Sequence, residues 1–123
     1  MTDRIVPKGQ AVNVPRYAFE AMAAYAALDG DKVAVMLLLL TRMDSNRDVR
    51  IDTSLLPDFL TLSSERVGRA VSGLIKKGWV DSVDEDAMRH RVLDCVVHPA
   101  FLHADFDTLM RMINTRLTAV DVH

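Results

Sequence analysis

The segment from Ser63 to Lys77 contains several side chains that can hydrogen-bond to the edges of DNA bases. An arginine can donate two parallel hydrogen bonds to O6 and N7 of guanine, a glutamate can accept one from the amino group of cytosine, and a serine can do either. Lysines are better suited to the phosphates of the backbone. We therefore predict base contacts from Ser64, Glu65, Arg66 and Arg69, and phosphate contacts from Lys76 and Lys77.

The spacing of apolar residues predicts a helix from Ser64 to Lys77. Ser63 is a favourable N-cap whose position leaves backbone N–H groups free to meet a phosphate, and Gly78 is a typical helix end. Apolar residues recur at the intervals i, i+3, i+4, i+7 and i+8, which gather on one face of a helix. That face holds Val67, Ala70, Val71, Leu74 and Ile75, and the opposite face holds Glu65, Arg69, Ser72 and Lys76.

The same pattern also suits an ordinary amphipathic helix whose charged face is solvated and whose terminal lysines complement the helix dipole. The short helix predicted before it and the hairpin predicted after it favour contact with DNA instead, and the positive charge is concentrated in the same segment. Residues 61–80 hold four basic residues against one acidic, a net charge of +3, whereas the rest holds eleven basic against sixteen acidic, a net charge of −5. Gly68 and Gly73 each weaken a helix by up to about 1 kcal/mol relative to Ala, which favours a close approach by another surface.

Residue composition and the spacing of apolar residues also predict the helices and strands on either side of this helix. Helices are predicted from Pro15 through the Ala-rich "RYAFEAMAAYAAL" and over residues 32–43, which are apolar nearly all round. A short strand is predicted near Val49 and Ile51, and a short helix between residues 53 and 60. Two Val-rich strands, 79–83 and 91–97, flank the polar loop 84–90, and an amphipathic helix covers 105–120.

This order predicts a mainly α fold with a small β-hairpin, a winged helix–turn–helix with extra N- and C-terminal helices. Residues 1–123 form a single domain in this interpretation, and residues 1–14 form an N-terminal arm. The helix 105–120 has a stripe of Leu, Met and Ile that could join two copies in a homodimer. The same stripe could equally pack within its own subunit.

The hairpin, or wing, carries charges of both signs. Arg89 and Arg91 are candidates for contacts with phosphates or the minor groove, whereas Asp84, Glu85 and Asp86 at the predicted tip would repel phosphate. The acidic tip therefore keeps a second function open, in which the winged helix binds another protein as an anti-repressor or assembly adaptor.

The stretch from Leu37 to Asp86 resembles winged helix–turn–helix proteins of the MarR-like superfamily, and in particular the small RepL-type plasmid and phage replication initiators. The likeness covers about residues 30–102. It implies a sequence-specific binder of double-stranded DNA, either a transcriptional regulator or a replication initiator. The residues that carry the likeness are Met43, Asp44 and Asn46 in a turn, then Ser63, Val67, Val71, Leu74 and Gly78.

Other classes of function find little support in the sequence. There is no glycine-rich phosphate loop, nucleophile elbow or catalytic triad, so we expect no enzyme and no cofactor. The four histidines and Cys95 lack the spacing of a metal site. The longest apolar run, residues 33–40, is far below the ~20 residues of a membrane span. A single cysteine and the absence of a leader-like start are typical of a cytoplasmic protein.

Overall fold

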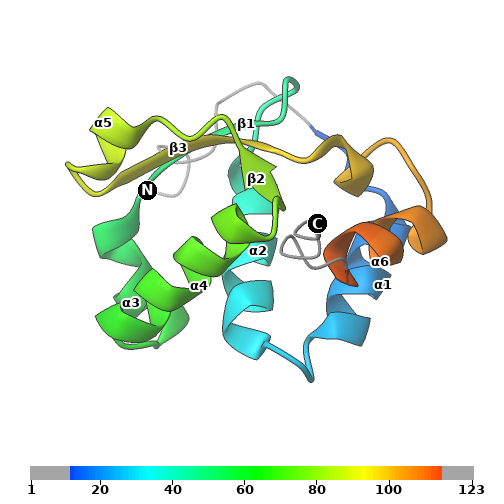
Figure 1. Cartoon of the computed structure of the whole chain (residues 1–123), viewed down its shortest axis with the longest axis horizontal. Helices are drawn as coiled ribbons and strands as arrows, with labels where there is room; N and C mark the ends of the chain where they lie inside the picture. The colour runs from blue at the N-terminus through cyan, green and yellow to red at the C-terminus, as the bar shows by residue number, and fades with distance from the viewer. Residues whose placement is uncertain (1–11, 115–123) are drawn as a thin grey trace, which may run out of the picture.

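A three-stranded antiparallel sheet lies along one side of the helices in the computed structural model, which describes residues 12–114 (Figure 1). Most of the described chain is helical. The strands are β1 (Asp48–Asp52), β2 (Val80–Asp81) and β3 (Val92–Val97), and short 3-10 turns cover Thr53–Leu55 (η2) and Pro99–Phe101 (η3). The helices are α1 (Arg16–Tyr25), α2 (Gly30–Arg42), α3 (Leu56–Leu60), α4 (Ser64–Lys76), α5 (Glu85–Met88) and α6 (Phe106–Asn114).

The sheet has the strand order β1-β3-β2, so the last strand in the chain lies in the middle. Val49 of β1 is paired with Cys95 of β3, and Val80 of β2 with Val97. Successive side chains of a strand point to opposite faces. Val49 and Ile51 are therefore buried under the sheet, while the three residues that alternate with them are exposed.

The core forms where α2 packs between α4 and the underside of the sheet. Met36 and Leu39 of α2 are fully buried, and Leu74 is fully buried on the facing side of α4. Trp79, just after α4, is also fully buried, with its ring edge-on to Tyr25 at a centroid distance of 5.2 Å. None of the helices in residues 12–114 combines the length and the apolar character that crossing a bilayer requires.

The hairpin differs from the sequence prediction. The first strand covers Val80–Asp81 instead of residues 79–83, because Ser82 has a positive φ of 52° that turns the chain out of the sheet. The predicted polar loop 84–90 contains the helix α5. Its start is stabilised by the Asp84 carboxylate, which accepts hydrogen bonds from the N–H groups of Asp86 and Ala87. The first helix ends at Tyr25, three residues before the predicted end at Leu28, and the boundaries of the helices 30–42 and 64–76 shift by one or two residues.

The C-terminal helix is described as far as Asn114. Within that range, Leu109 and Ile113 are fully buried in their own subunit, where α6 packs against α1. Over these residues the apolar stripe of the helix packs within its own subunit, which is the second of the two alternatives that the sequence left open. Residues 115–120 of the predicted helix and residues 1–11 of the predicted arm lie outside the described part.

Replacing Trp79 with Ala should lower the free energy of unfolding by about 3–5 kcal/mol, because it removes a fully buried aromatic side chain and leaves a cavity. Urea denaturation followed by circular dichroism measures this change. Leu28→Ala is the control: Leu28 is 74% exposed, so its loss should change stability by less than about 0.5 kcal/mol. A similar loss in both variants would contradict the position of Trp79 in the core.

Candidate nucleic-acid interface

Helix α4 follows α3 after a tight turn. Thr61 takes the left-handed conformation, with φ of 56°, and the N–H of Leu62 donates to the carbonyl of Pro57. The hydroxyl of Ser63 then accepts a 3.1 Å hydrogen bond from the N–H of Arg66, which makes Ser63 the N-cap that the sequence predicts. The serine side chain thus serves the helix itself.

The two faces of α4 follow the predicted division. Val67, Ala70, Val71 and Leu74 are buried, mainly against α2, and Ile75 at the edge of this face is partly buried. On the opposite face, the carboxylate of Glu65 lies 3.6 Å from the guanidinium of Arg69, one helical turn away. The exposed residues of α4 that the prediction named are Ser64, Glu65, Arg66, Arg69, Ser72 and Lys76.

Arg66 is held by a carboxylate from another helix. Its Nε and Nη2 donate to the two oxygens of Asp31 at 2.8 and 2.6 Å, a bidentate pair that joins α4 to the first turn of α2. The hydrogen bond from Arg66 lowers the pKa of Asp31, and the same bond raises the pKa of Arg66. The predicted base-contacting guanidinium therefore already has an acidic partner.

Lys77 turns away from the exposed face of α4. Its Nζ donates a 3.2 Å hydrogen bond to the hydroxyl of Tyr25 and lies 5.4 Å from the centre of that ring. A phosphate would have to draw the ammonium group from this contact. Lys76 lies on the exposed side and is better placed than Lys77 for the phosphate contact that the sequence predicts.

The two glycines of α4 have different surroundings. A Cβ at Gly73 would lie 3.0 Å from Cε of Lys32, a buried lysine whose ammonium group is 3.4 Å from Asp29 and 5.4 Å from the centre of the Trp79 ring. Gly73 therefore makes room for a side chain of the core. At Gly68 an added Cβ would meet nothing within 4 Å, so this position opens onto a groove.

A groove of about 500 Å³ separates α4 from η2, α3 and the end of the hairpin. Its floor is apolar, with Val67 and Val71 among its residues, and its rim carries hydroxyl groups and one guanidinium. From the predicted set it brings together Ser64, Ser72 and Arg91. Sequence reasoning missed Thr53 and Ser54, whose position after a short strand gave no sign that they would face α4. The remaining lining residues are Pro57, Gly68, Ile75 and Met88.

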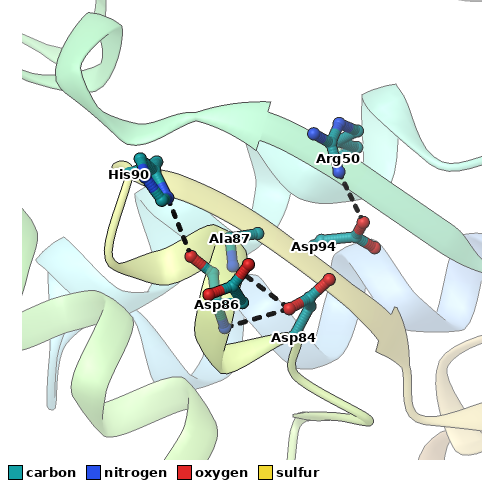
Figure 2. A network of polar contacts seen from close by, with 6 residues as sticks. All are labelled: Arg50, Asp84, Asp86, Ala87, His90 and Asp94. Atoms are coloured by element: carbon teal, nitrogen blue, oxygen red, sulfur yellow. Dashed lines mark hydrogen bonds and ion pairs between the residues drawn. The ribbon is translucent and has the colours of Figure 1, made fainter.

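Hydrogen bonds among its own residues hold the end of the hairpin together (Figure 2). Asp84 caps α5, and Nδ1 of His90 lies 3.1 Å from the carbonyl oxygen of Asp86. The carboxylate of Asp86 pairs with Arg89 at 2.6 Å. Arg89, predicted to contact phosphates, therefore has a local carboxylate partner, whereas Arg91 lies on the rim of the groove.

The described histidines, His90, His98 and His103, form no metal-binding cluster with Cys95. Residues 12–114 contain no group of three or more His, Cys, Asp or Glu side chains that could hold a metal ion. Cys95 is buried in the middle of β3, where desolvation raises the pKa of its thiol to about 12. Nδ1 of His98 accepts a hydrogen bond from the N–H of Ala100 and so helps to start η3.

Comparisons with protein family models, with curated proteins and with solved structures each gave no match. The geometry of α4, the groove and the hairpin is therefore the basis for any functional conclusion.

The pKa of Asp31 should lie below its ordinary value of 3.8 in the folded chain and return toward it in Arg66→Ala. Ionised Asp31 stabilises the fold above its unfolded pKa, and this contribution is lost as the pH falls through the lower folded pKa. Carboxyl-detected NMR titration measures both values. Arg89→Ala is the control, since it removes an arginine far along the chain from Asp31. An unchanged Asp31 pKa in Arg66→Ala would show that the pair is absent in solution.

Proposed function

We propose that this chain is a winged helix–turn–helix protein that binds double-stranded DNA in a sequence-specific manner, as a transcriptional regulator or a replication initiator. The observation that carries this proposal is the order of elements. Helix α2, strand β1, the pair α3–α4 and the hairpin β2–β3 follow one another, and β3 lies between β1 and β2. In a helix–turn–helix protein the second helix of the pair enters the major groove, which is the role we assign to α4.

The exposed side of α4 supports this role. Ser64 and Arg69 lie in its first two turns, where base contacts are made, and Lys76 lies at the far end, which suits a phosphate. The groove beside α4 also holds the hydroxyl groups of Thr53 and Ser54, which donate to the carbonyl of Arg91 and the carboxylate of Asp52. They would donate to a phosphate only after leaving these bonds.

DNA would have to displace carboxylate partners from the arginines of this surface. Arg66, Arg69 and Arg89 each have a carboxylate partner within the chain. The pairs of Arg69 and Arg89 are exposed on both sides, and such ion pairs are worth little, typically under about 1 kcal/mol. A phosphate or a guanine can displace these two carboxylates at small cost. The Arg66–Asp31 pair is bidentate and Asp31 is half-buried, so Arg66 costs more to release.

A second function, the binding of another protein, has one observation in its favour. Asp84, Glu85 and Asp86 are exposed at the end of the hairpin, where they would repel phosphates. A partner with a basic surface would suit this end. The two functions differ in their dependence on salt, since DNA binding loses affinity steeply as counterions are released.

Fluorescence anisotropy with duplex DNA from the neighbourhood of the gene, beside a scrambled duplex, tests the proposal at several salt concentrations. We expect tighter binding to the native duplex and a logarithmic salt slope of about −0.9 for each phosphate neutralised. Arg69→Ala should relax the preference for the native duplex, because a base contact is lost. Lys76→Ala should weaken binding to both duplexes and reduce the slope by about 1.

Arg16→Ala is the matched control, because it removes one exposed positive charge from α1 instead of α4. It should leave affinity and preference nearly unchanged. Failure to bind any duplex at low salt would refute the DNA-binding proposal and favour the protein-binding function. Equal losses in Arg16→Ala and Lys76→Ala would mean that α4 is not the contact surface.

A further inference from the structure

Strand β1 is an edge strand in the described part of the chain, with β3 on one side. Across that side, the carbonyl of Arg47 accepts a hydrogen bond from the N–H of Val97, and the N–H of Thr53 donates to the carbonyl of Arg91. The peptide groups of successive strand residues alternate in direction. Those of Val49 and Ile51 therefore point toward β3, and those of Asp48, Arg50 and Asp52 point away from it. Asp48 faces away, but its N–H and C=O bond to Asp44. The N–H and C=O of Arg50 and the N–H of Asp52 therefore form a short free edge.

The charges on this edge are arranged so that it complements itself. In an antiparallel pairing of two copies centred on Ile51, Arg50 of each copy lies opposite Asp52 of the other, and both side chains are exposed on the same face of the sheet. The N–H of each Asp52 then donates to the carbonyl of the opposite Arg50. A pairing centred on Arg50 would instead bring two arginines face to face, which is unfavourable.

Both charged groups have capacity for such a contact. Asp52 accepts its hydrogen bonds from Ser54 through Oδ1, which leaves Oδ2 open, and these bonds lower the pKa of its carboxyl. Arg50 donates to Asp94 through Nη1 and keeps further N–H donors for a second carboxylate.

Apolar surface beside the edge gives a second reason for it to be covered. A cavity of about 340 Å³ opens between β1, η2, α3 and the end of α2. Leu55 and Phe59 on its rim are 56% and 62% exposed, and large apolar side chains gathered in this way mark an interaction surface. Nε of Arg42, under the ring of Phe59, is buried with no hydrogen-bond partner among the described residues.

We propose that β1 is the contact between two copies of this chain, which join their edges in antiparallel register with Arg50 against Asp52. The two sheets then form one continuous sheet across a twofold axis, and the second copy covers Leu55 and Phe59. This interface differs from the one that the sequence predicts along residues 105–120, and it does not depend on whether the chain binds DNA.

Sedimentation velocity of the full chain over a range of concentrations tests the proposal through two charge reversals, Arg50→Asp and Asp52→Arg. The wild type should form a dimer. Each variant alone should dimerise at least about tenfold more weakly, because like charges then face each other twice. An equimolar mixture of the two variants should recover dimers, since every facing pair becomes opposite in charge again.

Arg89→Asp reverses another exposed, paired arginine and should leave the dimer unchanged. Leu55→Ser provides an independent test, because it should weaken the dimer without altering any charge or any buried residue. Circular dichroism establishes that each variant is folded. A wild type that stays monomeric at the highest attainable concentration would overturn the proposal. A dimer that neither charge reversal weakens, or a mixture that does not recover it, would overturn it as well.

Discussion

The burial of one face of α4 against α2 is the interaction on which the candidate surface depends. Val67, Val71 and Leu74 are each buried at this contact, and a fully buried side chain of this kind contributes about 1.5–3 kcal/mol. Because this face is buried, α4 cannot rotate about its own axis. Arg69 and Lys76, half a turn away from the buried stripe, are consequently presented outward, beside the groove that η2 and the hairpin complete.

Around that surface, positive charge is balanced locally. Arg66 is paired with Asp31, Arg69 with Glu65 and Arg89 with Asp86. The pairs of Arg69 and Arg89 contribute little to stability because they are exposed. In the proposed function, a binding partner has to compete with a carboxylate at each of these arginines, which penalises weak and non-specific contacts more than well-aligned ones.

Charged residues also line the free edge of the sheet, on strand β1. A free strand edge invites uncontrolled pairing, and charged residues are one way in which proteins prevent it. The exposed residues Asp48, Arg50 and Asp52 alternate in sign, so registers centred on any of these three bring like charges together. Registers centred on Val49 or Ile51 bring opposite charges together, but the peptide groups of Asp48 that the first would use are bonded to Asp44. The register centred on Ile51 is the one that remains for a second copy.

The sequence alone determined the elements whose signals are local. The helix beginning at Ser64 was predictable because its cap and its apolar repeat lie within fifteen residues, and the short strand near Val49 because its side chains alternate. Helix α5 was not, since its four residues are too few to show a period and its start depends on the turn at Ser82.

Tertiary structure alone decided the contacts between segments that are distant in the chain. Asp31 and Arg66 meet across 35 residues, and Lys77 and Tyr25 across 52, because the packing of helices brings their backbones together. A long exposed side chain can reach many partners, and no local pattern selects among them. The buried and exposed faces of α4 were therefore predictable from its residue pattern, whereas the partners of its charges, the groove beside it and the free edge of β1 arose only from the fold.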